Sequence, residues 1–238
     1  MKARTRRDLT IIPISEQDCL VVACDSCGAI GEKTGDVFKL PPRLTAKFTM
    51  RVALTEVLSS GALPVAAMNG VSCEMKPTGE ETIIGIKEEL KNAGITDIVL
   101  TGSTEENYTT CMTALAITVI GTAKESDLKF GQACIGDCLM LIGTPVFGSD
   151  VDLESVGYYA DIRHMLPMQG VREIVPTGSK GIAYEANMLA ALNNVSVDLH
   201  DTGIDYYKSA GPASCMLVLC DQAAAKEIPG MVIGTVVK

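Results

Sequence analysis

Apolar and polar positions in the first half of the chain follow the spacing of strands and helices in turn. The short apolar runs LTIIPI (9–14) and CLVVAC (19–24) predict two β-strands separated by a polar turn. Beyond a glycine-rich loop, apolar residues recur every three or four positions over residues 50–58, which predicts an amphipathic helix. Thr45 is the predicted N-cap of this helix, and Gly61 is predicted to stop it.

The pattern continues with a second helix and two further strands. The motif Thr78-x-x-Glu81 has the form of a capping box and predicts the start of the helix. The segments ITDIVLTG (95–102) and MTALAITVIGTA (112–123) predict strands. Gly121 indicates that the second of these strands lies at a sheet edge or leaves the sheet there.

A polar, turn-rich segment, AKESDLKFGQACIGD, separates this half from a less regular second half. We place a domain boundary there and predict domains at residues 1–124 and 125–238. Mixed strands and helices in both halves predict an α+β protein. In the second half, strands are predicted at residues 138–143, 214–220 and 231–237, and a helix at 183–192.

The composition limits the kind of protein and its partners. Hydrophobic residues make up 47% of the 238 residues and aromatic residues only 4%, so the core is predicted to be aliphatic. A net charge of −9 argues against nucleic acid, which requires a basic surface, but not against ATP, whose phosphates Mg²⁺ can shield. No apolar run approaches the roughly 20 residues that a bilayer requires. No secretory signal follows the basic start MKARTRRD, so we expect a cytoplasmic protein with no membrane partner.

Nine cysteines are scattered along the chain, mostly inside apolar runs, which is typical of reduced, buried thiols. Cys24-x-x-Cys27 leaves a redox or zinc function open. No second CxxC pair follows it, so this alternative is the weaker one.

Acidic residues occupy positions from which they could converge on one cation. Asp25 ends the apolar run CLVVAC, and Glu105 and Glu106 follow the predicted strand 95–102. Glu56 lies at the margin of the apolar stripe of the first helix. Mg²⁺ favours one or two such carboxylates together with phosphate oxygens and water. The alternative, that Glu56, Glu105 and Glu106 are solvated surface charges, stays open.

The segment Asp25-x-x-Gly28-x-x-Gly31-Glu32-Lys33 has the composition of a phosphate-binding loop. Its glycines would let backbone N–H groups approach a phosphate, and Lys33 would supply a countercharge. It lacks the spacing of a Walker A loop or a dinucleotide-binding motif.

Three arginines stand at the start of the chain. Arg4, Arg6 and Arg7 could form a disordered head or fold over an anionic ligand, since the guanidinium fork matches phosphate oxygens. We favour the disordered head.

The order of these segments resembles the aminoimidazole ribonucleotide (AIR) synthase superfamily. RVALTEVLSSGALPVA is similar to a signature helix of that superfamily, with Glu56 at the place of a metal-binding Asp. IVLTGSTEEN resembles its nucleotide segment, LKFGQACIGDCLMLIG the entry to its second domain, and SAGPASCMLVLC its last strands. GEKTGD and GSTEENYTT most resemble small bacterial α-ribazole kinases.

The resemblance implies a PurM-like fold whose N-terminal domain pairs with that of a second copy into a barrel-like homodimer. ATP and Mg²⁺ would lie in a cleft formed largely by that domain. The implied magnesium ligands are Asp25, Glu56 and Glu105; the implied ATP-binding residues are Gly28, Gly31, Lys33, Gly102, Ser103 and Thr104.

The implied reaction is transfer of the γ-phosphoryl group of ATP to the 5′-hydroxyl of α-ribazole, in salvage of the lower ligand of cobalamin. Asp25, Lys33 and Glu105 would carry the catalysis, with Glu105 or Glu106 orienting the acceptor. Gly178 and Gly181 would face that acceptor.

One departure from the superfamily keeps alternatives open. Ser103 stands where a second metal-binding Asp is usual, so either Glu105 replaces it or one metal position is lost. Another ATP-dependent activity of the superfamily, of the thiamine-phosphate kinase, selenophosphate or purine type, is one alternative. A non-catalytic nucleotide-binding dimer is another, and Ser103 favours it.

Overall fold

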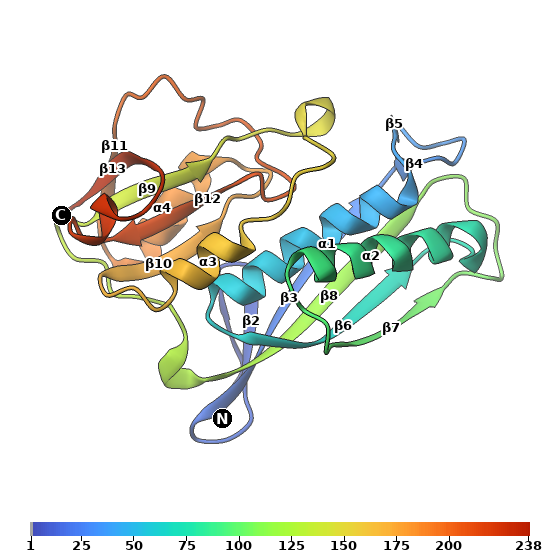
Figure 1. Cartoon of the computed structure of the whole chain (residues 1–238), viewed down its shortest axis with the longest axis horizontal. Coiled ribbons are helices and arrows are strands. Elements are labelled where there is room, and N and C mark those ends of the chain that lie inside the picture. Colours follow the sequence, from blue (N-terminus) through green and yellow to red (C-terminus); the bar gives the residue numbers. More distant parts are fainter. Residues whose placement is uncertain (1) are drawn as a thin grey trace. The chain divides into compact units, whose positions relative to one another are not determined.

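The computed structural model describes residues 2–238, which divide into two compact units (Figure 1). Unit 1 comprises the described residues up to Val57, together with Ala62–Ser126 and Leu153–Gly157. Unit 2 comprises Leu58–Gly61, Asp127–Asp152 and Tyr158–Lys238. The predicted domains, residues 1–124 and 125–238, stay a prediction.

Unit 1 is built on a six-stranded sheet with the order β1-β2-β3-β8-β6-β7. Neighbouring strands are antiparallel except β6 and β7, which are parallel. The mixed α+β class is therefore confirmed, whereas the barrel-like dimer stays a prediction. The strands are β1 (Arg4–Arg6), β2 (Leu9–Pro13), β3 (Asp18–Gly28), β6 (Leu63–Val71), β7 (Val99–Thr104) and β8 (Ala114–Lys124).

Two helices, α1 (Pro42–Ser59) and α2 (Glu80–Asn92), cover one face of this sheet (Figure 1). The predicted apolar stripe of α1 is confirmed, since residues such as Leu54 are fully buried. Arg51 of α1 donates to Glu89 of α2 at 2.6 Å, and both side chains are almost completely buried. A short parallel pair, β4 (Ile30–Gly31) and β5 (Phe38–Lys39), precedes α1, and a kinked turn (Met75–Gly79) precedes α2.

Both predicted helix caps are wrong. The first helix begins at Pro42, because proline fits the first turn, where its missing N–H leaves no bond unmade. Thr45 therefore lies inside the helix, and its hydroxyl faces the carbonyls of Ile30 and Pro41. In the predicted capping box Thr78-x-x-Glu81, the Thr78 hydroxyl donates to the Glu74 carboxylate and caps no helix.

Two predictions about strands are also corrected. β8 lies in the interior of the sheet between β3 and β6, so Gly121 marks no edge. A Cβ on Gly121 would lie 2.6 Å from Val57 Cγ1, so close packing against α1 explains this glycine. β3 extends to Gly28, and Asp25 therefore lies inside the strand, paired with Ile117, and opens no loop.

The N-terminal arginines are ordered, which corrects the expectation of a disordered head. Arg4 and Arg6 belong to β1, which pairs with β2 through a tight turn at Arg7. Arg4 forms an ion pair with Glu125.

Unit 2 contains a five-stranded antiparallel sheet with the order β10-β12-β9-β13-β11. Its aliphatic core includes Leu139, Leu217 and Ile233, none of which is exposed. The predicted strands and helix of this half are confirmed, whereas β10, β11 and α3 were not predicted. The elements are β9 (Cys138–Gly143), α3 (Tyr159–Met165), β10 (Val171–Pro176), α4 (Ile182–Asn193), β11 (Ser196–Leu199), β12 (Cys215–Cys220) and β13 (Met231–Val237).

Within residues 2–238, none of the helices combines the length and apolarity needed to cross a bilayer.

Candidate functional site

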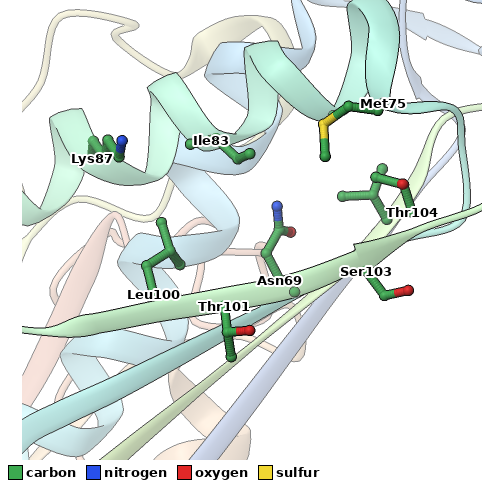
Figure 2. A pocket seen from close by; sticks show the side chains of 11 residues that line it. Asn69, Met75, Ile83, Lys87, Leu100, Thr101, Ser103 and Thr104 are labelled. Carbon is green, nitrogen blue, oxygen red and sulfur yellow. The ribbon is translucent and has the colours of Figure 1, made fainter.

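A cavity of about 260 Å³ lies between α2 and the strands β6 and β7 of unit 1 (Figure 2). Its walls are mostly apolar, formed by side chains such as Met75, Ile83 and Leu100. Asn69 and Lys87 add polar groups. A concave, largely apolar pocket with a few polar groups is the usual form of a small-molecule site.

Three of the six residues predicted to bind the nucleotide line this pocket from β7, namely Gly102, Ser103 and Thr104. The side chains of Ser103 and Thr104 differ in direction because successive strand residues face opposite sides of the sheet. Figure 2 shows Thr104 on the side of α2, whereas Ser103 points away from the helix. Ser103 can therefore contribute mainly backbone groups to the pocket.

Asn69 lies at the centre of the pocket wall, at 4% exposure. Its Nδ2 donates to Thr82 Oγ1 at 3.0 Å, and Thr82 Oγ1 donates to the Gly79 carbonyl at 2.8 Å. Within residues 2–238 no protein group donates to Asn69 Oδ1. The pocket therefore contains a buried acceptor whose orientation is fixed by α2.

A charged network adjoins the end of the pocket at Met75 and Thr104. Lys33 Nζ donates to Glu74 Oε2 at 2.6 Å, and the residue after Glu74 is Met75 of the pocket wall. Glu106 Oε1 accepts from both the Met75 backbone N–H and the Thr104 hydroxyl, each at 2.7 Å. Burial raises the pKa of Glu74, but hydrogen bonds from Lys33 and Thr78 bring it below its ordinary value. This end of the pocket thus combines a lysine with two acidic side chains.

The loop that carries Lys33 is held by Asp36. One carboxylate oxygen of Asp36 accepts from the Lys33 backbone N–H at 2.8 Å, and the other accepts from the Thr113 backbone N–H at 2.7 Å. A Cβ on Gly31 would lie 2.0 Å from Thr113 Oγ1 and 2.5 Å from Asp36 Oδ2. Close packing alone therefore accounts for Gly31, whereas Gly28 lies at the end of β3 with open space around it.

Glu105 and Glu106 are engaged in local hydrogen bonds. Glu105 Oε1 accepts from the backbone N–H groups of Asn107 and Tyr108 at 2.6 and 3.2 Å, which closes the turn after β7. Glu106 faces Thr104 instead, as described above. The interpretation of these acids as merely solvated charges is incomplete, because both shape the segment beside the pocket.

Asp25 is a half-buried acid on the helix-facing side of β3. Burial raises the pKa of its carboxyl to about 6; the Ser26 backbone N–H lowers it, and the neighbouring Asp8 carboxylate raises it further. A carboxylate that is destabilised in this way would gain from a bound cation.

Glu56, the second predicted magnesium ligand, is buried and has a protein cation beside it. Its Oε2 lies 3.5 Å from an Arg7 guanidinium nitrogen, and the Arg7 side chain is only 2% exposed. The turn of Arg7 and Asp8 therefore contributes a cation to Glu56 and an anion to Asp25.

The fit of these residues to a magnesium ion is partial. No three His, Cys, Asp or Glu side chains in the described chain are grouped so as to hold a metal. Asp25 fits a cation site, whereas Arg7 already balances Glu56 and the turn after β7 already uses an oxygen of Glu105. The donor set fits one carboxylate supplemented by phosphate and water better than a cluster of three.

Cysteine chemistry finds little support. Cys24 and Cys27 lie three residues apart in β3, so they point to opposite faces of the sheet. Burial, together with the carboxylates of Asp25 and Asp36, raises the pKa of Cys27 to about 11, which keeps the thiol protonated and unreactive. Four cysteines are buried and three are exposed, so burial explains fewer of them than expected.

The two glycines predicted to face the acceptor lie in unit 2. Gly181 adopts a φ of 81° next to the first turn of α4, where a Cβ would lie 2.8 Å from the carbonyl of Tyr206. Gly178 lies close to Glu185. Their predicted role stays a prediction.

The sequence alone did not indicate Asn69 or Glu74 as site residues. Asn69 lies on β6 and Glu74 follows shortly after its end, and β6 was not predicted because its sequence, LPVAAMNGV, combines Pro, Gly and Ala with little alternation. The parallel pairing of β6 with β7 places Asn69 beside Gly102, and such a contact has no local sequence signal.

The comparisons with known proteins agree with this fold. Residues 6–123 match the family model described as AIR synthase related protein, N-terminal domain. No curated protein matches the chain.

Several solved structures share the fold along nearly the whole chain. T. maritima PurL complexed with ADP has a TM-score of 0.76 and 13% identity, over 99% of this chain and 43% of that one. AaThiL complexed with AMPPCP and TMP has a TM-score of 0.71 and 14% identity, over 97% and 84%. E. coli HypE, a hydrogenase maturation protein, has a TM-score of 0.70 and 16% identity, over 92% and 79%.

This chain therefore spans less than half of PurL and about four fifths of the other two. The similarity to the AIR synthase related N-terminal domain is confined to residues 6–123, and the solved structures show that the chain shares their α+β fold.

Proposed function

We propose that this chain is an ATP-dependent phosphotransferase that phosphorylates a small nucleoside-like acceptor, with α-ribazole as the expected substrate. The observation that carries the proposal is the pocket between α2 and β7, with the charged network of Lys33, Glu74 and Glu106 at one end. At about 260 Å³ the pocket is slightly smaller than typical ligand sites of roughly 300–1,000 Å³. It would hold the base of ATP, and the triphosphate would extend towards Lys33.

The structural neighbours support a nucleotide at such a fold. PurL was solved with ADP and with ATP, and AaThiL with the nucleotide analogue AMPPCP. Phosphoryl transfer needs positioning and charge neutralisation more than covalent chemistry, and this suits a site built from backbone groups and one lysine.

The proposed roles follow from the positions of the side chains. Lys33, held in place by Asp36, would offset the charge of the transferred phosphoryl group, and Glu105 or Glu106 would orient the acceptor hydroxyl. Asp25 would hold Mg²⁺, with Glu56 joining it where Arg7 is displaced. When bound, the ion would supply positive charge that neutralises the phosphate groups.

The acceptor is proposed from the resemblance of GEKTGD and GSTEENYTT to α-ribazole kinases. We also propose a cytoplasmic homodimer. The face of the sheet opposite the helices bears exposed apolar side chains, including Val99 at 67% exposure, and a second copy could cover them.

The test is product formation from ATP and Mg²⁺ with a panel of acceptors that includes α-ribazole, thiamine phosphate and common nucleosides. We expect a phosphorylated product from α-ribazole and ADP in equal amount. Turnover of a different acceptor would keep the phosphotransferase and reject α-ribazole. A reaction without ATP serves as the control.

The second candidate is a non-catalytic nucleotide-binding protein. Ser103 replaces an expected metal ligand and points away from the pocket, and Arg7 balances Glu56. Binding of ATP in calorimetry, with no product from any acceptor, would favour this candidate.

A further inference from the structure

We propose that Asn69 selects the base of the bound nucleotide by accepting a hydrogen bond from an exocyclic amine, and so favours adenine over guanine. The inference rests on the proposed nucleotide site and assigns to it a specificity residue on β6.

The orientation of the Asn69 amide is set by the protein itself. The single hydroxyl hydrogen of Thr82 is donated to the Gly79 carbonyl at 2.8 Å, so Thr82 Oγ1 can only accept from Asn69. The atom that faces it at 3.0 Å must therefore be Nδ2, which leaves Oδ1 as the free end of the amide.

The free acceptor lies where a ligand would meet it. Asn69 is 4% exposed, and in Figure 2 its side chain rises from the sheet into the space below Ile83 and Met75. No group in residues 2–238 donates to Oδ1. A buried acceptor with no donor costs roughly 1–3 kcal/mol, so a ligand N–H at this point would be strongly favoured.

The surrounding wall restricts the kind of ligand. Met75, Ile83 and Leu100 present apolar side chains suited to a flat aromatic ring, and the pocket of about 260 Å³ admits a purine base. The 6-amino group of adenine supplies an N–H donor at the ring edge. Guanine has a carbonyl oxygen at that position, which would place two acceptors against each other.

The experiment compares three nucleotides on the full chain by isothermal titration calorimetry with Mg²⁺. The nucleotides are ATP, GTP and purine riboside triphosphate, which lacks the amino group of ATP and is otherwise identical. For the wild-type protein we expect ATP to bind about 3- to 10-fold more tightly than the amine-free analogue, which is the effect of one hydrogen bond. In Asn69→Leu this ratio should fall to about 1.

A second variant tests the fixed orientation. Thr82→Val removes the hydroxyl that holds the amide, so the amide can turn and offer Nδ2 to the ligand. We expect the preference for ATP over GTP to fall while circular dichroism and cooperative unfolding stay as in the wild type.

Three results would count against the inference. An ATP-to-analogue ratio that stays unchanged in Asn69→Leu would overturn it and leave the nucleotide site standing. Equal binding of ATP and its analogue by the wild type would do the same. Failure of the wild type to bind any of the three nucleotides would overturn the proposed function and this inference together.

Discussion

The half-buried Asp25 carboxyl should lower the stability of the folded protein at neutral pH, and Asp25→Asn should relieve that cost. Its folded-state pKa is raised from 3.8 to about 6, chiefly by burial. The folded state therefore holds the proton more tightly than the unfolded state. The stabilisation of the folded state by the protonated Asp25 carboxyl is fully present below about pH 4 and is lost as pH rises through 6.

The magnitude follows from the shift. A difference of about 2 pKa units corresponds to about 3 kcal/mol at about 1.4 kcal/mol per unit, and solvent access to the carboxyl makes this an upper value. About half of the cost develops between pH 5 and pH 8. Asparagine keeps the size of the side chain without the charge, so Asp25→Asn should have a higher free energy of unfolding than the wild type. This difference between the two proteins should be about 1–2 kcal/mol larger at pH 8 than at pH 5.

The assay is urea unfolding of both proteins at several pH values in the presence of EDTA, followed by circular dichroism. Asp97→Asn is the matched control, because Asp97 is exposed and its replacement should shift the curves little at any pH. Parallel pH dependences of the wild type and Asp25→Asn would refute the reasoning, as would an advantage of the variant confined to low pH.

Addition of Mg²⁺ and ATP should reverse the order of stability. A ligand that binds the folded state raises the free energy of unfolding, and only the wild type retains the carboxylate that would hold the cation. Equal stabilisation of both proteins would remove Asp25 from the proposed cation site.

Two further predictions concern charged pairs in unit 1. Lys33→Met should lower kcat by about 10²–10³ with a smaller change in ATP affinity, because Lys33 would act on charge that develops during transfer; an unchanged kcat in steady-state assays would remove Lys33 from the mechanism. Arg51→Met should lower the free energy of unfolding by about 3–5 kcal/mol, since it leaves the Glu89 carboxylate buried without its cation. The double variant Arg51→Met with Glu89→Leu should recover most of that loss in urea unfolding, and a single variant within 1 kcal/mol of the wild type would contradict the argument.

Local patterns in the sequence were enough to predict the elements that have a regular apolar stripe or an uninterrupted apolar run. The stripe of α1, the helix α4 and the strands β9, β12 and β13 all follow this rule. Hydrophobic spacing has the period of the element itself, so a single segment is enough to indicate it. Several ordered motifs likewise resembled the AIR synthase superfamily, and residues 6–123 match the model of its N-terminal domain.

The ends of these elements and the polar contacts were decided by tertiary structure. β3 continues past its apolar run to Gly28 because β8 supplies hydrogen-bonding partners for its polar end. Arg7 meets Glu56, and Lys33 meets Glu74, across some 40 to 50 residues of sequence. Charged side chains have no periodic signature, so only the folded chain shows which of them are paired.

The pocket itself also required the tertiary structure. Asn69 and Gly102 are adjacent because β6 and β7 pair in parallel around the intervening helix α2, and α2 in turn fixes the Asn69 amide through Thr82. The sequence determined which residue types were present for such a site. The long-range pairing of two weakly patterned strands decided which of their side chains face the ligand, because register sets the face to which each residue points.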